Sequence, residues 1–523
     1  MPKRPWLRAF LSMLAFVICA IGVFLFWRWV IDGGNSGPPT LGKETTAVSD
    51  AQYVRQDGSI SYVRAVNDWR SEGVTAETNA CVDLMRAVGP GAFAPAKWPL
   101  TWAAVAGPET KPPSGPFLGP APLTTQKQFD QYDQSMERAW RDDEFPQLFK
   151  YMQANQVPLD HAVAGSQKEH FYFPLIIADR ADVSLIEVLL PIAQASRNLV
   201  RGLKMRAMNH LANGRNQQCL DDLIAARRIG HLVSQKGLLI DHLVGTAIVH
   251  MTILCEVEAI ESGQLTPAEV NGYLAQLESL PEFNDLAECV DRMERLCSLD
   301  ALQSIRYGDQ NQVNQLANWT GSNGPDAMST SFDLDEAMEI INRFYDEQVQ
   351  IARAPTLAEQ VRLADAAEER LAGLAASSNS IAAGIQSWVG GNRSRGKIMG
   401  NVLATLMLPS VSQVCRADAR RLAMDRMAYL AFRLEQYRHQ NGDYPASLDE
   451  LQIGSSDSLT DPYSDRPILY QRREHGYQLH VVGINMQDDQ GVGLEESDGV
   501  NTFGDDWKIE IDRSETADNK TGE

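Results

Sequence analysis

The chain has 523 residues, of which 44% are hydrophobic, and a formal net charge of −21 at pH 7. These values indicate a folded protein of roughly three domains and exclude a disordered chain. The first 31 residues carry a charge of +4, so the remainder carries −25. This acidity argues against nucleic acid as a partner and against direct contact with anionic lipid.

The N-terminal region 1–31 contains an uncharged apolar run, Ala9–Trp27. At a rise of about 1.5 Å per residue, a helix of this length spans the hydrocarbon core of a bilayer. Lys3, Arg4 and Arg8 precede the run, and basic residues stay on the cytoplasmic side of a membrane. The pattern predicts a single-pass protein of the bacterial cytoplasmic (inner) membrane, held in the lipid bilayer by Ala9–Trp27, with its N-terminus inside and its bulk outside the cytoplasm.

The alternative is a cleaved signal peptide, whose apolar run has about 7–15 residues followed by small residues at the cleavage site. Here the run is longer and ends in the bulky residues Phe26 to Trp29, which fits an uncleaved anchor better. Residues 32–50 begin with a Gly- and Pro-rich stretch and are expected to form a linker, because Gly and Pro interrupt regular structure.

Region 51–165 has a mixed, loop-rich and helical pattern. Helices are expected over Thr78–Ala87, Gln126–Arg141 and Pro146–Asn155, the last opening with a first-turn proline. A Pro- and Gly-rich connector, residues 107–122, separates the first two of these helices.

Region 166–410 is predicted to be a body of helical hairpins. Its helices are joined by short turns, so consecutive helices must fold back antiparallel. Thr266, Pro267 and Glu269 give a concordant set of helix start signals. The helices are expected over Ile192–Ala212, Gln217–Ser234, Leu238–Glu261, Thr266–Leu280, Phe283–Tyr307, Asp333–Arg353 and Leu357–Ala376.

One of these helices, Leu238–Glu261, is apolar enough to suggest a second membrane span. It contains several ionisable residues, which are expensive in a lipid-exposed helix, so a buried core helix is predicted instead. They are Asp241, His242, His250, Glu256 and Glu258.

Of the seven cysteines, Cys19 lies in the apolar run and six lie beyond it. An even number in an oxidising compartment permits disulfides, but the spacing does not fix their connectivity. Cys289 and Cys297 are too far apart on one continuous helix to bond with each other. No CxxC pair is present, which argues against a zinc or redox site.

Region 411–512 is predicted to be an α+β module, followed by a disordered tail over 513–523. A long helix from Arg416 carries one apolar stripe and ends at Asn441. A short helix follows, opened by Ser447 and Glu450. Three strands are expected over Ile468–Gln471, Tyr477–Val482 and Trp507–Ile511, and in the second of them apolar and polar residues alternate, the pattern of a single buried face. The fold class is therefore mainly α with a C-terminal helix-on-antiparallel-sheet module.

This module carries a resemblance to a known family. The run YRHQNGDYPASLDEL (437–451), the turn DPYSDRPILY (461–470) and the segment GYQLHVVGINMQDDQGVG (476–493) resemble the globular domain of major type II secretion pseudopilins. The similarity covers about 100 of the 523 residues. The whole chain also resembles uncharacterised single-anchor bacterial envelope proteins. The pilin processing site is missing before the apolar run, so the anchor is expected to be a plain tether.

In pseudopilins the acidic Gly-rich loop binds calcium, so the resemblance implies a Ca²⁺ site here. Its candidate ligands are Asp488, Asp489, Asp505 and Asp506, and hard carboxylate oxygens suit this ion. The alternative is a solvated acidic tail, because residues 485–523 contain twelve acidic and three basic residues.

No complete catalytic constellation appears in the sequence, and no cofactor other than calcium is implied. Gly391–Lys397 approximates a phosphate-binding loop, but Ile398 stands where Ser or Thr would hold magnesium; a flexible basic loop is expected there. The first hypothesis is a non-enzymatic scaffold with protein partners in the envelope, linked to secretion or surface assembly. The second is an envelope hydrolase or ligand-binding enzyme with its site between the helical body and the C-terminal module.

Overall fold

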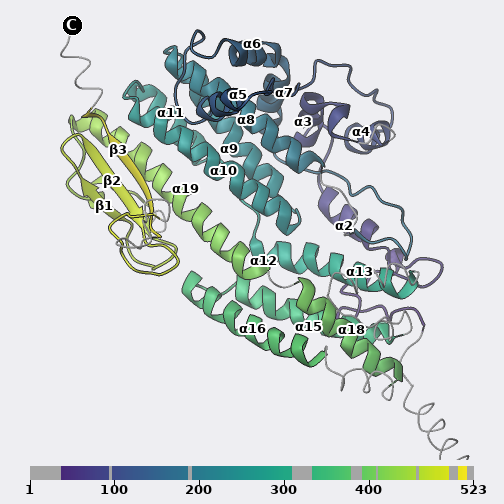
Figure 1. The fold of residues 1–523 in the computed structure, drawn as a ribbon. Coiled ribbons are helices and arrows are strands. Elements are labelled where there is room, and N and C mark those ends of the chain that lie inside the picture. The colour runs from purple at the N-terminus through teal and green to yellow at the C-terminus, as the bar shows by residue number, and fades with distance from the viewer. Residues whose placement is uncertain are drawn as a thin grey trace, which may run out of the picture.

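The computed structural model describes residues 37–93, 97–185, 191–308, 332–378, 391–407, 410–454, 459–493 and 505–514. The predicted anchor Ala9–Trp27 and most of the predicted tail lie outside these ranges. Within them the protein is mainly helical, with a small three-stranded antiparallel sheet near the C-terminus. A long helix, α19 (Ser410–Asn441), lies between the sheet and the other helices (Figure 1).

The N-terminal part of the described chain consists of short helices, with bounds α2 Tyr62–Ser71, α3 Ala80–Val88, α4 Trp98–Ala106, α5 Gln126–Gln134, α6 Pro146–Ala154 and α7 Gln156–Ser166. Helix α5 ends seven residues before its predicted last residue, Arg141. The chain turns there, and the indole of Trp140 is buried and donates to the Met205 carbonyl. Helix α7, which has no periodic apolar stripe, was not predicted.

The next helices start and end close to the predicted residues: α8 Pro191–Ala212, α9 Asn216–Ser234, α10 Leu239–Glu261 and α11 Pro267–Leu277. Thr266 and Glu269 make the predicted capping box, with reciprocal hydrogen bonds. The turn between α8 and α9 has only three residues, and the two helices pack side by side, as do α9 and α10 (Figure 1).

Helix α10 is, among the described residues, the one helix long and apolar enough to cross a membrane by length and composition. More than half of its apolar stretch is buried inside the protein, where it packs against α9 and α19. The buried residues include Asp241, His242 and Glu256. This packing agrees with the prediction of a core helix.

The remaining helices of the body are α12 Leu286–Glu288, the π-helical segment η4 Cys289–Glu294, α13 Arg295–Tyr307, α15 Leu334–Ala352, α16 Leu357–Ser378 and α18 Gly391–Met407. The predicted flexible loop over Gly391–Lys397 is wrong, because these residues form the first turns of α18. Arg393 pairs with Glu336 of α15 at 2.8 Å. A Cβ atom at Gly396 would lie 2.4 Å from the Asp333 carbonyl oxygen, so glycine permits the close approach of α18 to α15.

Part of the predicted linker 32–50 is docked on α15. The backbone N–H and the hydroxyl of Thr40 both donate to the Asp335 carboxylate at 2.7 Å. The Asn342 side chain donates to the carbonyls of Glu44 and Thr45 at 2.9 and 2.6 Å. These hydrogen bonds fix the chain just after residue 39 to the helical body.

In the C-terminal module α19 is followed by η5 (Leu448–Leu451) and the strands β1 (Leu469–Arg472), β2 (Gly476–Val481) and β3 (Trp507–Asp512). The strand order is β1-β2-β3, and both pairs are antiparallel. One face of the sheet packs on α19, and the apolar residues of this layer are Met427, Leu430, Leu434, Tyr477, Leu479, Val481, Ile509 and Ile511. The predicted helix and the three predicted strands are present.

Strand β2 differs from the prediction of a single buried face, because both of its faces are covered. Gln478 and His480, expected to be solvated, are 3% and 7% exposed. The segment 483–493, here called the acidic loop, folds back over this outer face. The Gln478 side chain donates to the Gln490 carbonyl at 3.2 Å, and His480 Nε2 lies 3.0 Å from Asp488 Oδ1.

The sheet and α19 also pack directly on α10. The Arg420 guanidinium of α19 lies 3.6 Å from the ring centroid of Trp507, and the His250 ring of α10 contacts the same indole edge-on. Arg513 donates to the Ile260 carbonyl at the end of α10. The six described cysteines are all buried and free, so the permitted disulfides do not form among the described residues.

Candidate metal site

The acidic loop and the residues before β3 meet at one edge of the sheet. Strands β2 and β3 are antiparallel neighbours, with Val481 opposite Trp507. The chain that leaves β2 therefore runs beside the chain that enters β3. This register brings Asp489 next to Asp505 and Asp506, although they are sixteen and seventeen residues apart.

Asp489, Asp505 and Asp506 each offer a carboxylate oxygen, and these oxygens lie within 4.8 Å of one another. Their other contacts orient them. Asp506 Oδ2 accepts from the backbone N–H groups of Asp489 and Gly491, both at 2.9 Å. Asp489 Oδ2 accepts from the Asn485 side chain at 2.8 Å, and Asp505 Oδ2 from the Asn485 backbone at 3.0 Å. The loop is thus shaped around the three carboxylates.

Two of the remaining oxygens have no hydrogen-bond donor among the described residues. Oδ1 of Asp505 and Oδ1 of Asp506 are both buried without a partner, and the Asp506 residue is only 2% exposed. Burial raises the pKa of Asp506, and the negative charge of Asp489 acts in the same direction, against the hydrogen bond from Gly491. Buried unpaired carboxylates are unfavourable unless a cation compensates them.

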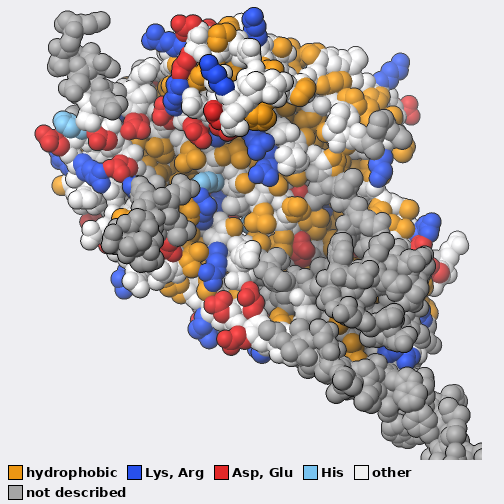
Figure 2. Space-filling view, viewed as in Figure 1, with side chains coloured by type: hydrophobic (Ala, Val, Ile, Leu, Met, Phe, Trp, Pro, Cys, Tyr) orange, Lys and Arg blue, Asp and Glu red, His pale blue; other side chains and the backbone are white. Residues whose placement is uncertain are grey.

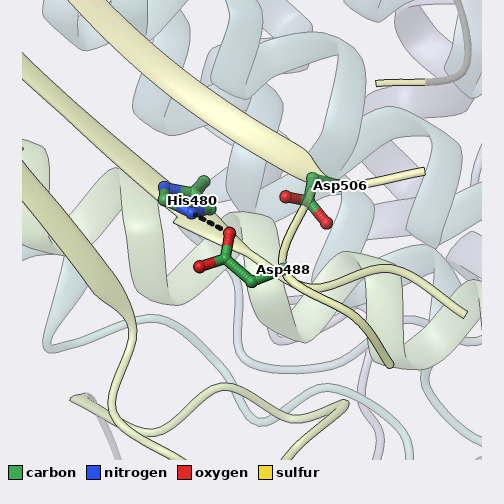
Figure 3. A group of neighbouring side chains, drawn as sticks. All are labelled: His480, Asp488 and Asp506. Carbon is green, nitrogen blue, oxygen red and sulfur yellow. Dashed lines mark hydrogen bonds and ion pairs between the residues drawn. The ribbon is translucent and has the colours of Figure 1, made fainter. Parts of the chain in front are cut away.

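The fourth predicted ligand, Asp488, has a different partner. Figure 3 shows Asp488 and His480 pointing toward one another, with Asp506 on the neighbouring segment that enters β3. Burial opposes ionisation of Asp488, but hydrogen bonds from the Gln490 backbone and from His480 outweigh it and lower its pKa. His480, Asp488 and Asp506 also lie close enough to share an ion. Sequence reasoning missed His480, whose alternating position in β2 indicated a solvated residue.

The composition of the cluster fits a hard cation. Ca²⁺ is bound by six to eight oxygen ligands, which carboxylates, backbone carbonyls and water supply together. The set Asp489, Asp505 and Asp506 contains oxygen alone, without the nitrogen or sulfur that zinc prefers. A Cβ atom at Gly483 would lie 2.0 Å from the Asp505 carbonyl oxygen. Only glycine at position 483 therefore leaves room for Asp505 to approach the end of β2.

The chain matches no family model, no curated protein and no solved structure. Only the side chains themselves therefore indicate what this site holds. The predicted calcium ligands separate into a cluster of three, Asp489, Asp505 and Asp506, and an ion pair of Asp488 with His480.

A second group of charged side chains, between α9, α10 and α19, is here called the buried ion network. Arg227 pairs with Glu256 at 3.2 Å and with Asp425 at 2.5 Å. Arg421 pairs with Asp425 at 2.8 Å and with Asp418 at 2.9 Å. The charges of Arg227 and Arg421 lower the pKa of Asp425 against the opposing effect of burial. These carboxylates pair with arginine side chains, and the pairs join α19 to the helical body. In the sequence, only the ionisable residues of the apolar helix α10 indicated such a network.

Proposed function

We propose that this protein is a membrane-anchored, extracytoplasmic interaction protein of the bacterial envelope whose C-terminal module binds Ca²⁺ through Asp489, Asp505 and Asp506. The observation that carries the calcium proposal is the pair of buried carboxylate oxygens without donors, Oδ1 of Asp505 and Oδ1 of Asp506, beside Asp489. The anchor proposal rests on the apolar run Ala9–Trp27 and the basic residues before it.

The bound ion would stabilise the acidic loop. Three carboxylates in one place repel each other, and a divalent cation removes that repulsion while it crosslinks the loop to the start of β3. The same loop exposes two large apolar side chains, Ile484 and Met486, which are 41% and 39% exposed. A loop fixed by the ion would hold these side chains ready for contact with another protein.

A second apolar surface supports an interaction role. Ile240, Leu243 and Leu254 are exposed on α10, and their spacing places them on one face of the helix. Figure 2 shows hydrophobic side chains gathered along the seam between the upper helices and α19, within a surface where acidic and basic side chains are otherwise mixed. An apolar helix face of this kind is a candidate surface for contact with another protein.

The link to secretion or surface assembly rests on the resemblance of the C-terminal module to pseudopilins. The Asp461-Pro462-Tyr463 turn that contributes to it has a physical role here. The Asp461 carboxylate accepts hydrogen bonds from the Tyr463 backbone at 2.8 Å and from the Val482 backbone at 3.2 Å. It thereby ties the turn before β1 to the end of β2.

The calcium proposal is tested on the full-length chain in detergent by its melting temperature, with and without millimolar Ca²⁺. We expect Ca²⁺ to raise the melting temperature, because it binds the folded state alone. Asp506→Asn keeps the size and the acceptor oxygen of the side chain and should abolish the rise. Asp488→Asn is the matched control on the same loop and should retain it. The absence of a rise in the unmodified chain, or its loss in the Asp488 variant alone, would contradict the assignment.

The interaction proposal is tested by site-specific photocrosslinking in native membranes. Crosslinkers at Leu254 on α10 and at Met486 on the acidic loop should capture the same envelope protein in repeated experiments. A crosslinker at Glu368, an exposed polar position on α16, is the control and should capture none. Equal capture at all three positions would mean that neither apolar surface is specific.

A further inference from the structure

A cavity of about 310 Å³ lies between the end of α2, the segment 170–171, the end of α9 and residues 282–288. Its volume is at the lower end of the range for small-molecule sites. It is formed by elements other than those of the metal site. The side chains that decide its chemistry are Arg70, Glu72, Lys236, Glu282, Phe283 and Asn284.

Arg70 differs from every other buried arginine among the described residues. The other four each form ion pairs with carboxylates: Arg206, Arg227, Arg295 and Arg421. Arg70 is 3% exposed and has no carboxylate within ion-pair distance in the described chain. Its Nη1 donates to the Phe173 carbonyl at 3.0 Å, and its Nε has no partner there.

The nearest acidic group to influence Arg70 does not serve as its counter-ion. Asp241 is close enough for the two charges to influence each other, but its carboxylate accepts a hydrogen bond from the Leu238 backbone at 3.0 Å and lies beyond ion-pair distance from Arg70. A buried guanidinium without a counter-ion is unfavourable. Because Arg70 lines an open cavity, an anionic ligand can provide the compensation from outside. A guanidinium binds a carboxylate with two parallel hydrogen bonds.

Most other charged residues of the cavity already have partners. Lys236 donates to the Trp69 carbonyl at 3.1 Å, and Asp285 caps α12 through the Ala287 backbone at 2.9 Å. Glu288 pairs with Arg292 at 3.4 Å.

Two acidic residues at the rim, Glu72 and Glu282, are exposed and form no ion pair within the described chain. The cavity therefore offers one buried cation, Arg70, and two exposed carboxylates without an ion pair in the described chain, while its other cation, Lys236, is held by the Trp69 carbonyl.

One wall of the cavity is an aromatic ring held in place on several sides. The rings of His231 and His242 pack nearly perpendicular to Phe283, with ring centroids 5.2 and 5.0 Å from its own. The Arg421 guanidinium lies 4.0 Å from the same centroid. A ring fixed in this way offers a rigid apolar surface to a ligand side chain.

We propose that this cavity binds a small zwitterion of the α-amino-acid class. Its carboxylate pairs with Arg70, its ammonium group lies toward Glu72 and Glu282, and its side chain packs against Phe283. The charges of the ligand then match the order of the charges in the cavity from the depth to the rim. The match gives specificity, because a plain carboxylate meets the acidic rim and a plain amine meets Arg70.

The test measures the melting temperature of the full-length chain in detergent with each of the common L-amino acids at about 10 mM. At least one should raise it by about 2 °C or more. For each amino acid that does so, the deaminated acid and the decarboxylated amine are measured as matched ligands, and both should give no rise. Absence of a rise with every amino acid, or an equal rise with the deaminated acid, would overturn the proposal.

Variants then locate the binding. Arg70→Met removes the guanidinium, keeps an unbranched side chain and should abolish the rise. Arg64→Met, at an exposed position of the same helix α2, is the matched control and should retain it. A full response in the Arg70 variant would overturn the proposal. If that variant does not fold, Glu282→Gln at the exposed rim serves instead: it should weaken amino-acid binding about tenfold and leave the melting temperature of the free protein unchanged. Unweakened binding in the Glu282 variant would likewise refute the proposal.

Discussion

Arg227 is the residue whose loss should most weaken the attachment of α19 to the helical body. Its side chain is 2% exposed, and it neutralises Glu256, which is fully buried, and Asp425, which is 18% exposed. After Arg227→Met, Asp425 still has Arg421 as a partner at 2.8 Å. Among the described residues, Glu256 then retains only the hydroxyl of Tyr273 at 2.6 Å. Burial raises the pKa of Glu256, and Arg227 acts against that rise.

The variant therefore leaves one buried carboxylate without a counter-charge. Removal of one partner of a buried ion pair lowers the free energy of unfolding by about 3–5 kcal/mol. The assay is urea unfolding of the full-length chain in detergent, followed by tryptophan fluorescence. Arg362→Met is the matched control, because Arg362 and its partner Glu359 are exposed, and an exposed pair contributes little to the free energy of unfolding.

A second variant separates the charge from the packing. Glu256→Gln in the Arg227→Met background removes the unpaired carboxylate, so the double variant should be more stable than Arg227→Met alone by at least about 1 kcal/mol. A free energy of unfolding for Arg227→Met within about 1 kcal/mol of the unmodified chain would refute the reasoning. It would mean that the network contributes no more than a surface pair.

Three further predictions follow from single sites. Burial lowers the pKa of His231 from 6.5 to about 4. The unfolded chain therefore binds more protons than the folded chain below about pH 6.5, and about 3 kcal/mol of the free energy of unfolding should be lost as the pH falls from 6.5 to 4. The loss should be smaller in His231→Asn. Identical profiles of the free energy of unfolding against pH for the two proteins would contradict this. Gly483→Ala should displace Asp505, so that at least about tenfold more Ca²⁺ is needed for the same rise in melting temperature. Gly272→Ala, where nothing meets a new Cβ atom, is the control and should respond to Ca²⁺ like the unmodified chain. Burial raises the pKa of the Cys255 thiol to about 12, so a maleimide should label this cysteine only after denaturation, as mass spectrometry of its peptide would show; rapid labelling of the native protein would contradict the burial.

Local sequence signals were sufficient where one element determines its own bounds. The end of α19 follows from Gly442, which has a φ of +86°, and the start of α11 follows from its capping box. The second and third strands were predicted from their apolar alternation, and the first from its place across a hairpin from the second. Such features depend on residues within a few positions of one another, so they are visible in the sequence.

Features that depend on distant segments were not visible. The first turns of α18 contain two glycines and several charged residues, and they are helical because they pack on α15. The outer face of β2 is buried because the acidic loop returns over it. The sequence indicated four acidic residues as candidate ligands. The separation of Asp488 from the cluster of Asp489, Asp505 and Asp506 could not be predicted, because it depends on the register of β2 and β3. The missing partner of Arg70 could not be inferred at all, because it requires knowledge of every carboxylate around it.

The resemblance to pseudopilins suggests a head that could be separated from its helical body, but the contacts of β3 argue for a different view. Trp507 at the start of β3 is enclosed by Arg420 of α19 and His250 of α10, and Arg513 after β3 donates to the end of α10. The buried ion network joins the same helix α19 to α9 and α10. If region 411–512 were removed from the body, Asp425 would lose Arg227, and Asp418 would lose His242. The sheet, its acidic loop and the helical body are therefore expected to unfold as one cooperative unit, and calcium bound at the sheet should stabilise α9 and α10 as well.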